Sequence, residues 1–142
     1  MDDTADALAS TTAADGPLVL IVDDNPDTLA ICARALAAAG YRAAVASSAA
    51  EGLAQFDDTP PAVVVLDLVM PDQDGFETAR AIRRRTATTP ILVFTGLSPD
   101  VESRARQAGA SAFCTKPLDP RRLVAEVRRL CPVGREDTTW TT

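Results

Sequence analysis

Three short stretches of this chain are apolar at nearly every position, and they constrain its fold more than any other feature. They are residues 18–22, 62–66 and 91–94. A strand that is solvated on one face alternates apolar and polar residues, so continuous apolar runs indicate strands that are buried on both faces. Burial on both faces is typical of a parallel sheet with helices on each side.

Stretches with helical patterns separate these strands, and two weaker strand patterns complete the series at 42–46 and 111–114. Five helices are expected. Three of them cover residues 26–39, 76–85 and 120–130. Another begins at a capping box over residues 48–51, and the last runs from Ser98-Pro99 to Gly109. Asn25 and Asp119 stand at N-cap positions, and each precedes a proline at the first helical position. Five β–α units in this order predict a doubly wound α/β fold.

The two ends of the chain differ in composition from the part between them. Residues 1–16 consist mainly of Asp, Ala, Ser and Thr without an apolar period, which predicts a flexible acidic arm. Residues 133–142 form a polar tail in which Trp140 is the one large apolar side chain. A single folded domain is therefore expected over 17–132, a normal size for one core.

Charge and cysteine usage exclude several classes of function. Twenty acidic residues against 14 basic ones give a net charge of −6, which disfavours nucleic-acid and anionic-membrane partners. No apolar run reaches the ~20 residues of a membrane span, and the N-terminus does not resemble a signal peptide. Cys32, Cys114 and Cys131 are odd in number and lack metal-ligand spacing, which predicts reduced thiols in the cytoplasm. The chain has no histidine, which excludes a Ser-His-Asp triad, a histidine base and most catalytic zinc sites.

Polar residues follow four of the five expected strands. Ligands bind at the carboxyl edge of such sheets. The residues expected there are Asp23 and Asp24 after the first strand, Asp67 after the third, Thr95 and Gly96 after the fourth, and Lys116 with Pro117 after the fifth.

The three acids predict a metal site. Carboxylates that lie close together disfavour one another's ionisation, and a hard divalent cation removes the conflict. Mg²⁺ suits one or two carboxylates together with water and phosphate oxygens. The loop 23–26 has no glycine to present backbone N–H groups to a phosphate, so phosphate would need a bridging metal. An acidic surface turn is the plain alternative for Asp23-Asp24, and the alignment with Asp67 argues against it.

The remaining residues at this edge suit the transfer of a phosphoryl group. Asp67 follows a buried strand, and a carboxylate there can act as a nucleophile. Lys116 is the one lysine among 14 basic residues, so a compact ammonium is expected to be required at this position. Thr95 can donate a hydrogen bond to a phosphoryl oxygen, and Gly96 leaves room beside it.

These motifs resemble the receiver domain of two-component response regulators over about residues 17–131. The resemblance rests on the acid pair Asp23-Asp24, the run 67–75, Thr95-Gly96 and Lys116-Pro117, and on the spacing between them. It implies a flavodoxin-like five-stranded sheet of order 2-1-3-4-5 with five helices. It also implies a bacterial phosphoprotein that regulates rather than an enzyme, because the chain would catalyse only its own phosphorylation and dephosphorylation.

The resemblance further implies a role for each residue of the site. Asp67 would accept a phosphoryl group from a histidine on a sensor kinase or a phosphotransfer protein. Asp24 and Asp67 would hold Mg²⁺ directly, with Mn²⁺ as a possible substitute. Asp23 would act directly or through water, and the backbone carbonyl of Val69 would be a further ligand. Thr95 and Lys116 would bind phosphoryl oxygens, and a cis Lys116–Pro117 bond is typical of the family.

The resemblance also implies a switch and a lifetime for the phosphorylated state. Phe113 is expected to turn inward when Thr95 moves toward the phosphoryl group, although a permanent place in the core is the plain alternative. Val69 and Leu97 lie two positions beyond Asp67 and Thr95 and cannot orient a hydrolytic water. Slow self-dephosphorylation is therefore expected.

Three functions fit these residues. The first is a stand-alone phospho-acceptor that signals by binding a protein or passes its phosphoryl group onward, since few residues follow the last expected helix. The second is a phosphohydrolase of the haloacid dehalogenase type, which needs an acid where this chain has Val69. The third is a receiver that has lost its chemistry and acts as an adaptor, which the complete set of acids, hydroxyl and lysine argues against.

Overall fold

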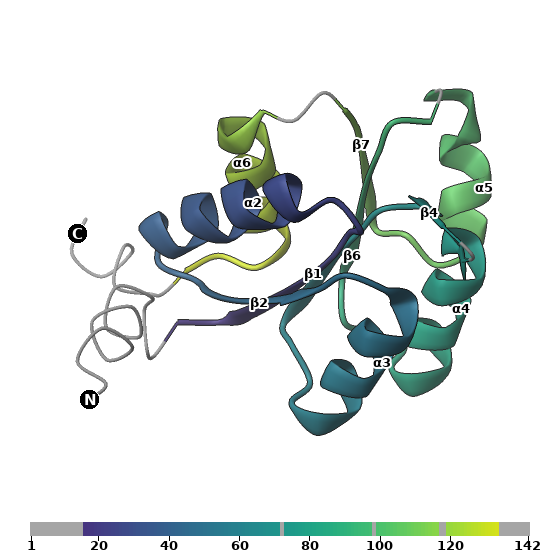
Figure 1. Ribbon diagram of the computed structural model, residues 1–142, viewed down its shortest axis with the longest axis horizontal. Coiled ribbons are helices and arrows are strands. Elements are labelled where there is room, and N and C mark those ends of the chain that lie inside the picture. The colour runs from purple at the N-terminus through teal and green to yellow at the C-terminus, as the bar shows by residue number, and fades with distance from the viewer. Residues whose placement is uncertain (1–15, 72, 98, 117–118, 134–142) are drawn as a thin grey trace.

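The computed structural model describes residues 16–71, 73–97, 99–116 and 119–133 (Figure 1). The five predicted strands are present as β1 (Leu18–Val22), β2 (Arg42–Ala46), β3 (Val63–Leu66), β6 (Ile91–Thr95) and β7 (Ala112–Thr115). The helices are α2 (Pro26–Ala38), α3 (Ala49–Asp58), α4 (Gly75–Arg85), α5 (Glu102–Gln107) and α6 (Pro120–Leu130). The predictions for the arm 1–15, the tail 134–142 and the Lys116–Pro117 bond lie outside the described residues.

The five strands form one parallel sheet of order β2-β1-β3-β6-β7, which confirms the predicted order. Helices α2 and α6 lie on one side of the sheet, and α3, α4 and α5 lie on the other (Figure 1). Alternate residues of β1 supply the two cores: Leu20 and Val22 join the cluster under α3 to α5, whereas Val19 and Ile21 join the cluster under α2 and α6. The continuous apolar pattern of β1 is thus explained by burial on both faces.

The helix caps follow the sequence closely. Asn25 accepts hydrogen bonds from the backbone N–H groups of Asp27 and Thr28, and α2 ends before Gly40, which has a φ of +101°. Asp119 caps α6 in the same way through Arg121 N–H. At α3, Ser48 accepts from Glu51 N–H as the capping box predicts, and the Glu51 carboxylate accepts from Ser47 N–H.

Two features differ from the sequence-based expectation. The helix expected from Ser98-Pro99 begins at Glu102, after a single 3₁₀ turn over Pro99–Val101, and Val101 at its N-cap position makes no side-chain cap hydrogen bond. A small antiparallel hairpin of β4 (Val69–Met70) and β5 (Gln73–Asp74) follows β3 and was not expected. In the described part of the chain, no helix has both the length and the apolar character that crossing a bilayer requires.

Candidate functional site

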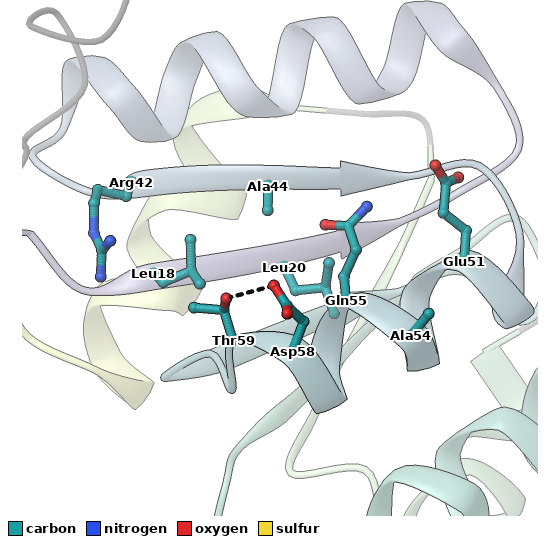
Figure 2. Close-up of a pocket in the computed structure, with 9 residues that line it drawn as sticks. All are labelled: Leu18, Leu20, Arg42, Ala44, Glu51, Ala54, Gln55, Asp58 and Thr59. Carbon is teal, nitrogen blue, oxygen red and sulfur yellow. Dashed lines mark hydrogen bonds between the residues drawn. The ribbon is translucent and has the colours of Figure 1, made fainter.

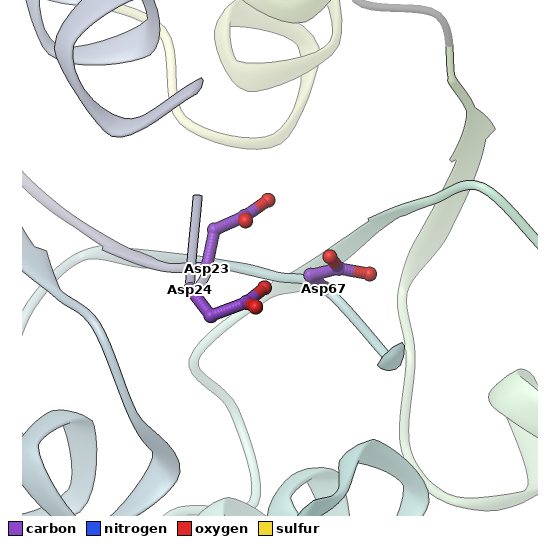
Figure 3. A group of neighbouring side chains, drawn as sticks. All are labelled: Asp23, Asp24 and Asp67. Carbon is purple, nitrogen blue, oxygen red and sulfur yellow. The ribbon is translucent and has the colours of Figure 1, made fainter. Parts of the chain in front are cut away.

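The carboxyl edge of the sheet brings the three predicted acids together. Asp23 follows β1 and Asp67 follows β3, and these strands pair in register with Val22 opposite Leu66. Figure 3 shows the three side chains at this edge. One carboxylate oxygen from each of Asp23, Asp24 and Asp67 lies within 4.8 Å of the other two. Asp23 and Asp67 are 3% and 4% exposed, whereas Asp24 is open to solvent.

Each of the two buried carboxylates has a partner for both of its oxygens. Asp23 Oδ1 accepts from the N–H of Asn25 at 2.9 Å, and Asp67 Oδ1 accepts from the N–H of Val69 at 3.0 Å. The second oxygens, both Oδ2, accept from the ammonium of Lys116 at 2.9 Å from Asp23 and 3.2 Å from Asp67. The backbone therefore holds each carboxylate in a fixed orientation with one oxygen toward Lys116.

Lys116 reaches the acids from the end of β7, on the far side of β6. Its backbone N–H donates to the carbonyl of Thr95 at 2.7 Å, which fixes the strand end relative to β6. Burial by itself lowers the pKa of the Lys116 ammonium, but the hydrogen bond to Asp23 and the charges of Asp67 and Asp23 outweigh burial and raise it. The ammonium is thus held in its charged form between two buried carboxylates.

Thr95 and Gly96 close the site at the end of β6. The Thr95 side chain is fully buried, and its Oγ1 accepts from Leu97 N–H at 3.3 Å. Because that bond uses the oxygen as acceptor, the hydroxyl proton can still be donated. A methyl group added at Gly96 would meet no heavy atom within 4 Å among the described residues, so space remains beside Thr95.

The other predicted residues are Phe113 and Val69. Phe113 on β7 is half-buried and packs against the core cluster under α3 to α5, together with Leu97. The Val69 side chain is 50% exposed, two residues after Asp67. The structure thus gathers the predicted acids and the lysine. It links Val69 to Asp67 and Lys116 to Thr95 through backbone N–H groups, and it places Phe113 against the core under α3 to α5.

Gly75, the last residue of the run 67–75, supports the site through a close backbone contact that was not predicted. A Cβ at Gly75 would lie 2.3 Å from the Cα of Leu68, the residue that follows Asp67. The Gly75 N–H also donates to the Leu68 carbonyl at 3.2 Å. The Asp74-Gly75 pair before an amphipathic stretch is the signal that points to a cap with a close backbone contact.

The donor set fits a hard divalent cation. The site holds three carboxylates but one ammonium group, that of Lys116. It therefore has an excess of negative charge that a divalent cation would neutralise. The exposed Asp24 carboxylate leaves the cluster open to solvent on one side. The backbone carbonyl of Val69 remains a predicted further ligand.

The three cysteines take no part in this cluster of acids. They are free thiols, with Cys32 and Cys114 buried and Cys131 half-buried. Burial, followed by the charge of Asp23, raises the pKa of Cys32 to about 11, so this thiol is unreactive at neutral pH.

A separate pocket of about 480 Å³ lies beside β1, β2 and α3 (Figure 2). Leu18, Leu20 and Ala44 form its apolar part, and charged side chains such as Arg42 and Glu51 line its margin. None of the predicted site residues lines this pocket. It is therefore distinct from the acidic cluster.

Comparison with known proteins gives one consistent result. The family model described as the response regulator receiver domain matches residues 19–128. The transcriptional regulatory protein TrcR of Mycobacterium tuberculosis is 38% identical over 113 residues, which cover 79% of this chain and 44% of TrcR. An uncharacterized 14.6 kDa protein of Leptolyngbya boryana is 32% identical over 116 residues, which cover 80% of this chain and 88% of that protein.

The fold is also similar to that of solved structures. The crystal structure of the chemotaxis protein CheY4 of Vibrio cholerae superposes with a TM-score of 0.76 at 31% identity, covering 80% of this chain and 98% of CheY4. The chain spans about half the length of the first curated relatives that it matches, for example 44% of TrcR.

Proposed function

The chain belongs to the response regulator receiver domain family, and on that basis we propose that it is the phospho-acceptor switch of a two-component system. The residues 17–132 act as the receiver domain. Asp67 accepts a phosphoryl group from a phosphohistidine on a sensor kinase or a histidine phosphotransfer protein. The modified protein then binds a partner protein or passes the phosphoryl group onward.

One observation carries this proposal: the Asp67 carboxylate is buried but is held beside a cation and two further acids. A carboxylate oxygen of Asp67 attacks the phosphorus atom, and the bond from phosphorus to the donor histidine breaks. The electron pair of that bond leaves with the imidazole, which takes up a proton. The product is an acyl phosphate on Asp67. Such a transfer depends on positioning and charge neutralisation more than on covalent machinery.

Asp24, Asp67 and Asp23 would hold Mg²⁺, or Mn²⁺ in its place, with the Val69 carbonyl as a further ligand. When bound, the metal supplies positive charge for the incoming phosphoryl oxygens. Lys116 supplies the remaining charge, because its ammonium already contacts an oxygen of Asp67. Thr95 binds a phosphoryl oxygen through its hydroxyl proton, with Gly96 leaving the space that the group needs.

The readout of the switch involves Phe113. Phosphorylation adds about two negative charges and three acceptor oxygens to Asp67. Movement of Thr95 toward this group would vacate space next to β7, and the half-buried Phe113 would turn into it. Because phenylalanine has no hydroxyl group, the change is communicated by packing.

The surface chemistry favours a protein as the partner. A net charge of −6 supports a protein rather than a nucleic acid or an anionic membrane. The three free cysteines support a cytoplasmic location, where thiols stay reduced.

Incubation with acetyl phosphate and Mg²⁺, followed by intact-mass measurement, tests the proposed function. A single added phosphoryl group that is lost slowly is expected, and Asp67→Asn abolishes it. Continuous release of inorganic phosphate would instead indicate a phosphohydrolase. An unchanged mass with both acetyl phosphate and a phosphorylated histidine donor would indicate an adaptor without this chemistry.

A further inference from the structure

A groove of about 340 Å³ runs between α2 and α6, on the side of the sheet away from α3 to α5. Its lining includes Ala35, Ala38 and Ala39 on the α2 side, and Arg121, Val124 and Arg128 on α6. This groove is separate from the acidic cluster, and the proposed function gives it no role.

The groove exists because the α2 side chains that face it are small. Ala35, Ala38 and Ala39 are spaced by three and four positions, so they share one face of the helix and offer only methyl groups. Val124 adds an apolar wall from α6 and packs against the core beneath. Arg121 and Arg128 add positive charge along the exposed side. An apolar groove bordered by guanidinium groups suits an aromatic ring. The ring can bury apolar surface in the groove and make cation–π contacts with the guanidinium groups.

The C-terminal part of the chain leaves the domain next to this groove. The Tyr41 hydroxyl donates to the Cys131 carbonyl at 2.6 Å, which fixes the end of α6 to the start of β2. A Cβ at Gly40 would lie 3.2 Å from Val133, so Val133 sits beside the residue that follows Ala39. The tail therefore starts beside the C-terminal end of α2, next to Ala39 in the lining of the groove.

Trp140 stands seven residues beyond Val133 in the sequence, and it is the chain's only tryptophan. Seven residues span at most about 25 Å when extended. The length of α6 is only about 15 Å at the usual helical rise, so Trp140 can reach every part of the groove. The tail also carries Glu136 and Asp137 between Val133 and Trp140, and these acids complement the arginines of α6.

We propose that the groove between α2 and α6 is the docking site for the chain's own C-terminal tail, with the Trp140 indole seated on the three alanines and Val124. The indole packs between Arg121 and Arg128, and Glu136 and Asp137 meet the basic side of α6. Residues 134–142 lie outside the described residues. The groove, the exit of the tail at Val133 and the complementary charges support this docking.

Tryptophan fluorescence of the full chain tests this docking directly, because Trp140 is the chain's only tryptophan and the emission is excited at a wavelength that Tyr41 does not absorb. In the native protein we expect a blue-shifted emission maximum and quenching by acrylamide at least twofold weaker than for a synthetic peptide of residues 134–142. Emission and quenching equal to those of the free peptide would overturn the proposal. A blue shift that grows with protein concentration would assign the groove to the tail of a second copy and would also overturn it.

Two variants on α2 test whether the indole lies in the groove: one fills the groove, and the other is a control outside it. Ala35→Gln combined with Ala38→Gln fills the groove and is expected to return the emission and quenching to the peptide values. Ala30→Gln adds the same side chain at an exposed position of α2 outside the groove and should leave both unchanged. Retention of the blue shift in the folded double variant would place the indole elsewhere and refute the site.

A measurement on the unmodified chain keeps the test independent of how the variants fold. Nuclear Overhauser contacts between the indole protons of Trp140 and the methyl groups of Ala38 and Val124 are expected. If the indole shows contacts to methyl groups of another region, or to none, the proposed docking is wrong.

Discussion

The ammonium of Lys116 lies between two buried carboxylates, and this arrangement explains why the chain's one lysine stands at this position. Its distance of 2.9 Å to Asp23 is that of a charge-assisted hydrogen bond, and its distance of 3.2 Å to Asp67 is within the range of an ordinary hydrogen bond. An ammonium is a compact charge that can turn its three donors toward different oxygens, whereas a guanidinium is planar and larger. At the scale of single residues, the site depends on that difference.

Lys116→Arg is therefore expected to impair phosphorylation although the charge is kept. Loss of one charge-assisted contact should slow the reaction of Asp67 with acetyl phosphate by roughly ten- to a hundredfold. The rate can be followed by intact mass, with Arg122→Lys on the exposed face of α6 as the matched exchange that leaves it unchanged. A Lys116→Arg rate within twofold of the unmodified chain would count against the assigned role.

Val69 and Leu97 are expected to prolong the phosphorylated state. Neither side chain can hydrogen-bond a water molecule, and the half-exposed Val69 stands next to the acceptor. Val69→Asn combined with Leu97→Gln should shorten the half-life of the phosphorylated chain several-fold, as measured by intact mass after removal of the donor. Val45→Asn, a similar exchange at another exposed valine, should leave the half-life unchanged. An equal or longer half-life in the double variant would contradict this account.

At the scale of elements, the start of α4 is packed against the loop that carries Asp67. Asp74 caps the helix through Phe76 N–H, and Gly75 brings the helix to within contact of the Leu68 backbone. Any side chain at Gly75 must push that loop away, because the atoms it would meet belong to the backbone. The position of the acceptor is thus coupled to the packing of α4.

Gly75→Ala should consequently destabilise the fold by about 1–3 kcal/mol, the usual cost of overpacking. Gly96→Ala serves as the control, because its added methyl group meets no described atom within 4 Å and should change stability by less than about 0.5 kcal/mol. Urea unfolding followed by circular dichroism measures both values. Equal stability of the two variants would show that the close approach at Gly75 is not a constraint.

The elements that sequence predicts well are those with strong local signals. The continuous apolar pattern identified β1, β3 and β6, and the caps at Asn25 and Asp119 located α2 and α6 to within a residue. The hairpin of β4 and β5 has two residues in each strand, too few to form a pattern. The start of α5 was misplaced because a serine-proline pair suggested a cap, whereas the chain forms a 3₁₀ turn there.

The sequence predicts which residues share the site, but it does not predict which of the acids contact Lys116. Ligands bind at the carboxyl edge of a parallel sheet, and this rule predicts that the acids, Thr95 and Lys116 lie in one site. The choice of Asp23 and Asp67 as the partners of Lys116 depends on the strand register and on where β7 ends. Those are properties of the packed sheet, and no local pattern encodes them.

At the scale of the whole molecule, the site joins three strands that are not all neighbours. Asp23, Asp67 and Lys116 come from the ends of β1, β3 and β7, so the fold must be formed before the acids meet. A cation that binds this cluster binds the native state alone, and it stabilises the fold by mass action.

Mg²⁺ should therefore raise the melting temperature of the chain. At one hundred times the dissociation constant the native state gains about 2.7 kcal/mol, which corresponds to several degrees for a domain of this size. Asp24→Asn should melt at a higher temperature than the unmodified chain in EDTA, because one like charge is removed, and should lose most of the Mg²⁺ response. Scanning calorimetry in EDTA and in Mg²⁺, at matched ionic strength, measures both effects. An undiminished Mg²⁺ shift in Asp24→Asn would refute the proposed metal site.

Reductive trapping identifies the residue that accepts the phosphoryl group, which we propose to be Asp67. Borohydride converts an aspartyl phosphate to homoserine, which peptide mass mapping assigns to one position. After treatment with a phosphorylated histidine donor and Mg²⁺, we expect homoserine at position 67 and none at 23 or 24. Homoserine at Asp23 or Asp24, or at no aspartate in the chain, would contradict it.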